Sequence, residues 1–200
     1  MDLELKNKTA IITGAAGGIG RKLALGLVRE GCHVALLDLS EEKASEAART
    51  AAAADPAGHT KATAHYCDVT KRLSVENAFA TIERKLGPAH ILINSHQLWP
   101  HDWFVDITDE QWRKTIDVNL TSYYLTCQAM VKQMLRHKVT GSILNISSQA
   151  AFRGATTGHA HYAAAKAGIL GLTKSIAREV ATRGITCNAL APGMALTPAT

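Results

Sequence analysis

Tyr162 and Lys166 lie four residues apart in the segment YAAAK at 162–166. At 3.6 residues per turn, this spacing places both side chains on one face of a helix. A free phenol titrates near pH ~10, and a cation held beside it favours the phenolate and lowers its pKa. The pair therefore predicts a tyrosine tuned for acid–base chemistry near neutral pH. The alternative is that the two residues share a helix face without function.

A glycine-rich segment near the N-terminus, TGAAGGIG at 13–20, separates an apolar run of strand length from a helical pattern. Glycines permit a tight turn and let the backbone approach a pyrophosphate closely. The start of the following helix offers unpaired N–H groups and a positive dipole end to an anion. In this position the segment predicts a dinucleotide phosphate site.

Two aspartates follow later strands. Asp38 stands eighteen residues after Gly20, where its carboxylate can accept hydrogen bonds from the adenosine ribose hydroxyls and repel a 2′-phosphate. Neither Leu39 nor Ala16 supplies a cation for such a phosphate, so we expect NAD rather than NADP. Asp68 either contacts the adenine amino group or caps the next helix.

Short apolar runs alternate with helical segments along the whole chain. We expect strands at 9–13, 33–38, 63–68, 90–94, 142–147 and 185–190, and helices at 19–30, 41–54, 72–86, 109–137 and 159–183. This alternation predicts a parallel sheet covered on both faces, within one domain spanning 1–200. Right-handed crossovers then give a doubly wound, Rossmann-like α/β fold with strand order 3-2-1-4-5-6 and ligands at the carboxyl ends of the strands.

Composition excludes several other classes. With 46% hydrophobic and 20% charged residues, the chain is typical of a globular protein, and no apolar run approaches the ~20 residues of a membrane helix. No signal-peptide core stands at the N-terminus, so we expect a cytoplasmic protein. The net charge of +5 is scattered, which argues against nucleic-acid binding. The cysteines and histidines lack metal-ligand spacing, so we expect neither disulfides nor a metal site.

Several motifs follow one another along the chain: the glycine segment, Asp38, Asp68, Asn119, Ser148, YxxxK and Pro192-Gly193. In this order they resemble the short-chain dehydrogenase/reductase family, from Lys8 to Thr197. Within this family, the chain is similar to 3-oxoacyl-carrier-protein reductases, or to sugar and polyol dehydrogenases. The resemblance implies hydride transfer between NAD(H) and a secondary alcohol or ketone. It also implies a homodimer or homotetramer assembled through the helices at 109–137 and 159–182.

The resemblance assigns roles to individual positions. Tyr162 would exchange a proton with the substrate oxygen, and Lys166 would lower the pKa of Tyr162 and bind the nicotinamide ribose. Ser148, or failing that Ser147, would hold the substrate oxygen. Asn119 would bind a relay water, form a buried amide at a helix kink, or both. The positions implied in cofactor binding are Gly14, Ala16, Gly18, Ile19, Gly20, Asp38, Leu39, Asp68, Val69, Asn94, Ser95, His96, Tyr162, Lys166, Pro192, Gly193 and Thr197.

Two features depart from the family pattern. Where the family usually has Asn-Asn-Ala-Gly after the fourth strand, this chain has NSHQ at 94–97, so a side chain at Gln97 replaces glycine. His96 then joins the proton path, contacts substrate, or packs in place. Family members also continue beyond the equivalent of Thr200, so either the sequence is part of a longer chain or the seventh strand and the C-terminal substrate segment are absent.

Three functional hypotheses follow. The first is an NAD(H)-dependent oxidoreductase acting on a small molecule, with Trp99, Trp103 and nearby histidines lining the substrate mouth. The second is a non-catalytic dinucleotide-binding scaffold or redox-sensing dimer, which would have no need of the acid–base residues. A hydrolase using Ser148 would need a nucleophile-elbow glycine pattern, which its surroundings lack.

Overall fold

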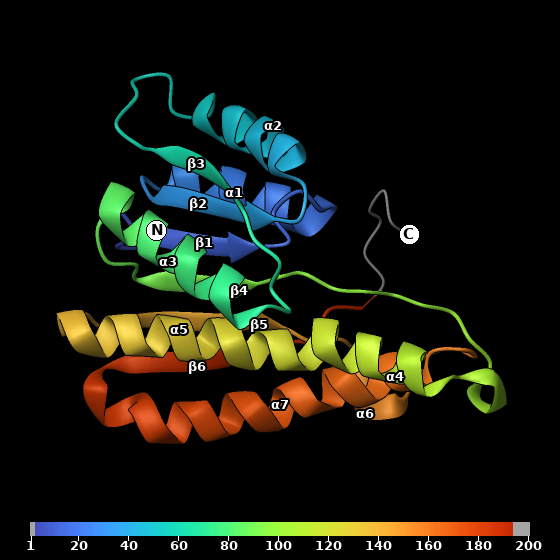
Figure 1. Ribbon diagram of the computed structural model, residues 1–200. Helices are drawn as coiled ribbons and strands as arrows, with labels where there is room; N and C mark the ends of the chain where they lie inside the picture. The colour runs from blue at the N-terminus through green and yellow to red at the C-terminus, as the bar shows by residue number, and fades with distance from the viewer. Residues whose placement is uncertain (1–2, 194–200) are drawn as a thin grey trace.

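Six parallel strands form one sheet in the order β3-β2-β1-β4-β5-β6, which confirms the predicted Rossmann-like topology (Figure 1). The computed structural model describes residues 3–193. Within that range, no helix is both long enough and apolar enough to cross a membrane. The strands are β1 (Thr9–Thr13), β2 (His33–Asp38), β3 (Ala62–Tyr66), β4 (Ile91–Asn94), β5 (Gly141–Ile146) and β6 (Ile185–Leu190).

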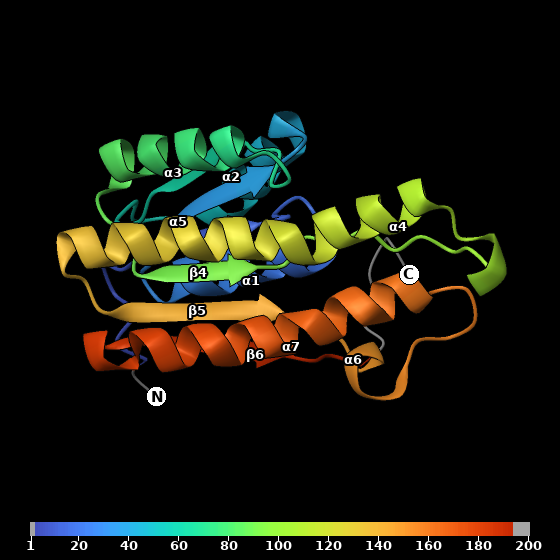
Figure 2. The ribbon, with the colours of Figure 1, turned by 60° about the horizontal axis from the view of Figure 1, so that its bottom comes forward.

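Helices cover both faces of this sheet. Figure 2 shows the face covered by α3 (Arg72–Leu86), α5 (Ser122–His137) and α7 (Ala160–Val180), with α1 (Gly18–Arg29) and α2 (Glu41–Ala52) on the other side. Successive strand residues point to opposite faces, so Ile11 joins the core under α3, α5 and α7, whereas Ile12 joins the core under α1 and α2. Both cores are apolar, which explains why the central strands are continuous hydrophobic runs.

The turn from β1 into α1 depends on two glycines. Gly14 has φ +63°, and a Cβ atom there would lie 2.6 Å from the His96 Cα atom. At Gly20 a Cβ atom would lie 2.6 Å from the Gly14 carbonyl oxygen. A side chain at Gly14 would push the turn away from the loop after β4, and a side chain at Gly20 would push the start of α1 away from the turn. Both glycines therefore allow α1 to begin directly above the end of β1.

The long helix expected at 109–137 is interrupted. The chain forms α4 (Asp109–Ile116), a π-helical turn (Asp117–Thr121) and then α5. Single π-turns of this kind are often found at functional sites, and this one contains Asn119. The helix expected at 159–183 ends at Val180 and continues as a 3-10 turn (Ala181–Arg183). Two further short helices were not anticipated, a 3-10 turn (Phe104–Asp106) and α6 (Ala150–Arg153).

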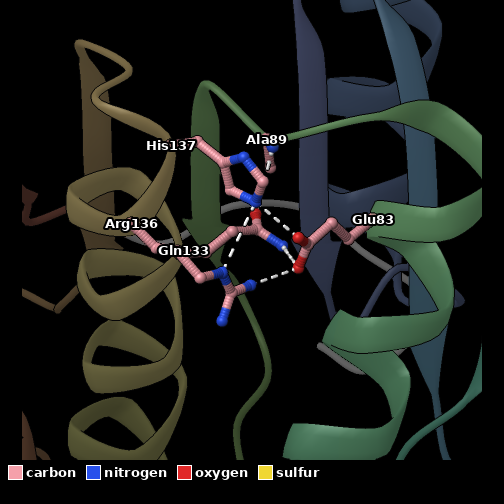
Figure 3. Close-up of polar contacts among 5 residues, drawn as sticks. All are labelled: Glu83, Ala89, Gln133, Arg136 and His137. Atoms are coloured by element: carbon pink, nitrogen blue, oxygen red, sulfur yellow. Dashed lines mark hydrogen bonds and ion pairs between the residues drawn. The ribbon is translucent and has the colours of Figure 1, made fainter.

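A polar cluster joins α3 and α5 at the amino end of the sheet (Figure 3). The Glu83 carboxylate accepts a hydrogen bond from Gln133 Nε2 at 3.0 Å and forms ion pairs with Arg136 and His137. The side-chain oxygen of Gln133 also accepts the Ala89 backbone N–H at 3.0 Å. The cluster therefore fixes the two helices to the segment that leads into β4, at the edge opposite the carboxyl ends of the strands.

Candidate active site

Tyr162 lies in the first turns of α7, beside the carboxyl ends of β4 and β5. The residue is 4% exposed, and its phenol O–H donates a hydrogen bond to Gln97 Oε1 at 3.0 Å. Burial raises the pKa of Tyr162 above its ordinary value, although the Ser148 hydroxyl acts in the opposite direction. At neutral pH the phenol therefore carries its proton.

Lys166 follows one turn later and is fully buried. Its ammonium donates to the Ile146 carbonyl at 2.9 Å and approaches the Tyr123 hydroxyl at 3.4 Å. The same nitrogen lies 5.5 Å from the centre of the Tyr162 ring. Burial lowers the pKa of Lys166 to about 7, since a charged amine is poorly solvated there.

The predicted proximity of Tyr162 and Lys166 is present, but the predicted pKa shift is not. We expected the lysine to lower the pKa of Tyr162, and the structure shows a raised pKa instead. The reason is that burial disfavours the charged form of both groups. In addition, Lys166 donates to the Ile146 carbonyl rather than to the phenol oxygen.

Tyr123 is a member of the site that the sequence analysis missed. Its buried hydroxyl lies 3.0 Å from the carbonyl oxygens of His96 and Ile146, close to the Lys166 amine. Burial raises the pKa of Tyr123 well above its ordinary value, so the phenol stays neutral. No sequence motif marks this residue; its position four residues after Asn119, one turn along the helix, was the available signal.

The two serines after β5 have different roles. The buried Ser147 hydroxyl donates to the Lys166 carbonyl at 2.8 Å and so ties β5 to α7. Ser148 is half-buried, accepts the Ala150 N–H at 3.1 Å and influences the ionisation of Tyr162. The structure thus brings Ser148, rather than Ser147, next to the tyrosine.

Asn119 is buried and holds the loop after β4. Its side-chain oxygen accepts the Leu98 N–H, and its side-chain nitrogen donates to the Leu98 carbonyl, both at 2.8 Å. Two roles were predicted for the Asn119 side chain. Its contacts agree with one of them, a buried amide at a helix irregularity. These two bonds leave one lone pair on the amide oxygen and one hydrogen on the amide nitrogen, so the binding of a relay water stays a prediction.

The loop after β4 is also attached to the start of α7. Trp99 stacks on His159 with ring centres 3.8 Å apart, and its ring meets Tyr162 edge-on at 4.3 Å. His159 donates to the Pro100 carbonyl at 2.6 Å. His161 is completely buried, so it does not line a substrate mouth as expected, whereas His159, 5% exposed, supports the loop and also borders a groove. Trp99 does border the tyrosine and is 46% exposed.

His96 packs into the core and does not point toward a ligand. Its ring nitrogens lie 2.6 Å from the hydroxyls of Thr13 and Ser122. Because Ser122 donates its own proton to the Val118 carbonyl, Nε2 of His96 carries the hydrogen and Nδ1 accepts from Thr13. Burial lowers the pKa of His96 to about 3, so the ring is neutral and does not act as an acid in the proton path.

Asn94 and Ser95, both expected at the cofactor, also use their side chains internally. The Asn94 amide donates to Asn145 Oδ1 at 2.9 Å and accepts from Thr126 at 2.8 Å. The Ser95 hydroxyl donates to the Thr13 carbonyl at 2.6 Å. Asn94 and His96 are buried, so any contact of theirs with a cofactor would come from the backbone, whereas the half-buried Ser95 hydroxyl can still accept a hydrogen bond.

At the glycine segment, Asp38 accepts hydrogen bonds from the Ala16 N–H at 3.0 Å and the Ser40 N–H at 3.2 Å. A cation does lie nearby, contrary to the sequence analysis. Arg21 donates to the Ala16 carbonyl at 3.0 Å and pairs with Glu46 at 2.9 Å. Leu39 is 64% exposed directly after Asp38.

The remaining predicted positions lie at the same edge of the sheet or beyond the described residues. Asp68 accepts from the N–H and hydroxyl of Thr70, at 3.0 and 2.6 Å, so it shapes the loop rather than capping α3. The Val69 side chain belongs to the core. The Pro192 carbonyl accepts the Gln149 N–H at 3.1 Å, which brings Pro192 and Gly193 close to Ser148. Thr197 lies outside the described residues.

The donor set at the glycine segment suits a dinucleotide. No side chain caps the N-terminus of α1 at Gly17, so the N–H groups of Gly18, Ile19 and Gly20 are open to an anion. Asp38 stands beside this helix start and offers carboxylate oxygens to a ribose. The phosphate and ribose positions therefore fit one end of a dinucleotide, and Tyr162 lies where the other end would be expected.

Comparisons with known proteins agree with this geometry. The family model described as short chain dehydrogenase matches residues 8–200. The 3-oxoacyl-[acyl-carrier-protein] reductase FabG of Staphylococcus epidermidis is 35% identical over 94% of this chain and 75% of its own length. The 3beta-hydroxysteroid dehydrogenase of Mediterraneibacter gnavus is 37% identical over 96% of this chain and 68% of its own length.

A solved structure gives the same result. NAD+-bound xylitol dehydrogenase superposes with a TM-score of 0.89 at 28% identity, covering 95% of this chain and 71% of that one. The fold, the family model and the relatives all point to one group of oxidoreductases that use nicotinamide dinucleotides. The chain belongs to the short-chain dehydrogenase family.

Proposed function

We propose that the protein transfers a hydride between NAD(H) and a secondary alcohol or ketone, with Tyr162 as the acid–base residue. The observation that carries this proposal is the pairing of a buried, protonated tyrosine with a buried lysine at the strand ends. The two groups lie on the same edge of the sheet as the open helix start at Gly17.

In the reductive direction, Tyr162 gives its phenol proton to the substrate oxygen while the carbonyl carbon accepts hydride. A bound nicotinamide dinucleotide supplies that hydride. The phenolate left on Tyr162 is stabilised by the Lys166 ammonium, which lies 5.5 Å from the ring. The Ser148 hydroxyl donates to the substrate oxygen as charge develops there.

The preference for NAD(H) rests on Asp38. Its carboxylate would repel a 2′-phosphate, and the nearby Arg21 is already paired with Glu46. Replacing Asp38 by Asn should raise the ratio of kcat/KM for NADPH over NADH by at least about tenfold, equivalent to about 1.4 kcal/mol. The exposed substitution Asp109→Asn serves as the matched control, and an unchanged ratio in Asp38→Asn would count against NAD(H) selection by this carboxylate.

The substrate class favoured here is a ketone with an apolar chain or ring, such as a 3-oxoacyl compound. Trp99 is half-exposed beside Tyr162, and exposed Trp103 and Phe104 border a groove of about 450 Å³ that also includes His159 and Ala163. Such surfaces suit apolar groups better than sugars or polyols, which need convergent hydrogen-bonding groups. The two relatives compared by sequence act on 3-oxoacyl and steroid compounds, according to their names, whereas the solved structure named above is that of a xylitol dehydrogenase.

The test is oxidation of NADH and of NADPH with a panel of 3-oxoacyl thioesters, cyclic ketones and sugars. We expect turnover with the apolar ketones and, in Tyr162→Phe, a loss of roughly 10²–10⁴-fold with cofactor binding retained. Activity that survives in Tyr162→Phe would refute the proton role. Cofactor binding without turnover of any substrate would favour the non-catalytic scaffold instead.

We also propose that two copies associate through α5 and α7, as the family resemblance implies. The exposed face of α7 carries the small residues Ala164, Ala167 and Gly171, which permit close helix approach. Light scattering with size-exclusion chromatography should give at least twice the 21.4 kDa chain mass. A substitution Ala167→Arg should lower that mass, and a mass unaffected by it would argue for another interface.

A further inference from the structure

The acceptor of the Tyr162 proton is a side chain that the family pattern lacks. Gln97 Oε1 accepts the phenol hydrogen at 3.0 Å. A side-chain amide oxygen can accept but not donate, so this bond requires the phenol to be protonated. The interaction therefore selects one ionisation state of the tyrosine.

The backbone on both sides of Gln97 is held in place. Before it, the His96 ring is hydrogen-bonded to Thr13 and Ser122. After it, the Leu98 N–H and carbonyl are both bonded to Asn119 at 2.8 Å. Gln97 itself is exposed, so its side chain can change rotamer without any movement of the loop.

A substrate ketone needs the same proton. General acid catalysis requires the ketone oxygen within about 2.6–3.2 Å of the phenol, which is the position that Gln97 Oε1 now takes. A phenol has a single hydrogen to donate, so Gln97 and the substrate oxygen compete for it. Once displaced, the exposed amide is free to turn toward solvent.

We propose that Gln97 is a positioning residue for Tyr162. Its side-chain carbonyl keeps the phenol protonated and oriented as a donor, and the substrate oxygen then displaces this carbonyl. This inference rests on the proposed function of Tyr162. It predicts two separable effects of Gln97, one on the ionisation of the tyrosine and one on substrate affinity. The first can be measured without any substrate.

The first experiment titrates Tyr162 directly. Tyrosine is replaced biosynthetically by a fluorinated tyrosine that ionises at lower pH, and the signal from Tyr162→Phe is subtracted. In Gln97→Leu the phenol loses its acceptor, so its titration should move down by about one pH unit, equivalent to about 1.4 kcal/mol and within the range of a net hydrogen bond. In Gln97→Glu a carboxylate accepts the proton and repels the phenolate, so the titration should move up.

The matched control is Gln128→Leu, which removes a half-buried glutamine bonded to another tyrosine hydroxyl, that of Tyr124 at 3.1 Å. It lies on α5 away from the site and should leave the Tyr162 titration unchanged. A Tyr162 titration that is identical in wild type and Gln97→Leu overturns the proposal. So does a downward shift in Gln97→Glu.

The second experiment measures ketone reduction as a function of pH. In Gln97→Leu, KM for the ketone should fall severalfold because the competitor is gone, while kcat on the neutral plateau stays within about twofold. The alkaline limb of the kcat/KM profile, where activity falls as Tyr162 ionises, should move to lower pH together with the Tyr162 titration. An unchanged KM and limb would overturn the competition between Gln97 and substrate. A shifted titration in a protein that reduces no ketone would instead sink the proposed function and leave the Gln97–Tyr162 interaction standing.

Discussion

The environments of ionisable side chains differ between the two ends of the sheet. At the amino end, burial acts to raise the pKa of Glu83, but hydrogen bonds from Gln133 and His137 and the charge of Arg136 outweigh it and leave the pKa lowered (Figure 3). At the carboxyl end, Lys166 and His96 bond to neutral carbonyl and hydroxyl groups, and burial lowers their pKa values to about 7 and about 3.

This difference separates stability from reactivity. Paired charges at the amino end favour the folded state and keep Glu83 ionised. At the carboxyl end, the buried Lys166 ammonium bonds to a neutral carbonyl, so its charged form destabilises the folded state and its pKa lies near neutral pH. Proteins commonly tolerate such a destabilised site because its function requires it.

The largest effect should come from Lys166→Met. Turnover should fall roughly 10²-fold or more, because the phenolate of Tyr162 loses its stabilising cation. The pKa of Lys166 is about 7 when folded and about 10.4 when unfolded. The unfolded chain therefore binds more protons in that window, and wild-type stability should rise with pH by up to about 1.4 kcal/mol per unit.

Urea unfolding of the ligand-free protein at about pH 6, 7 and 8 tests this slope, below the range where buried thiols titrate. Lys166→Met should flatten the slope and be more stable than wild type near pH 6. The exposed Lys174→Met on the same helix is the control. Equal slopes in wild type and Lys166→Met would show that the buried amine carries no such penalty.

A smaller effect, with the same sign of pH dependence but at lower pH, should come from His96→Ala. Near pH 7.5 the variant should lose about 1–3 kcal/mol with its two hydrogen bonds and ring packing. The wild-type ring stays neutral when folded, with a pKa of about 3, and titrates near 6.5 when unfolded. Wild-type stability should thus be lost as pH falls from about 6.5 toward 3, whereas the variant should lose less.

Acid unfolding curves compare the two, with the exposed His59→Ala as the control, its side chain being 82% exposed. If His96→Ala and wild type lose stability in parallel below about pH 6, the buried neutral histidine is not the source of the acid sensitivity.

At the amino end, Glu83→Gln should cost about 1 kcal/mol near neutral pH without affecting turnover, because it removes the charge that binds Arg136 and His137. The lowered pKa of Glu83 means that its contribution is present above the unfolded value of about 4.5 and is lost as pH falls through the folded value. The two unfolding curves should therefore converge in acid. A loss of turnover would contradict the separation of the two ends.

The smallest effect should come from Arg136→Ala. The Arg136 side chain is 61% exposed, so solvent screens its pair with Glu83. We expect a loss below about 1 kcal/mol that shrinks when salt is raised to about 1 M. A salt-independent loss as large as that of Glu83→Gln would mean that the arginine is a structural centre of the cluster rather than a peripheral charge.

Much of the fold could be predicted because it depends on local patterns. Apolar runs of strand length alternating with helical segments allow few topologies, and the observed sheet order is the predicted one. The long helix at 109–137 was predicted without its π-helical turn, since no periodicity distinguishes five residues of wider winding.

Much less of the site could be predicted. The sequence placed Tyr162 and Lys166 on one helix face but not the direction of the tyrosine pKa, because desolvation depends on all the surrounding elements. Tyr123 was missed because it carries no motif and meets Lys166 only through the packing of α5 against α7. The contact between Asn119 and Leu98 could not be predicted either, because Leu98 lies in the loop after β4, on a separate segment of the chain.

The sequence by itself determined the strand order, the glycine turn and the residue types that meet at the carboxyl edge, because these follow from periodicity and spacing along the chain. Only the tertiary structure decided which groups are charged and which atom receives the Tyr162 proton. Those properties depend on burial and on contacts such as Gln97 with Tyr162, sixty-five residues apart, that no local pattern specifies.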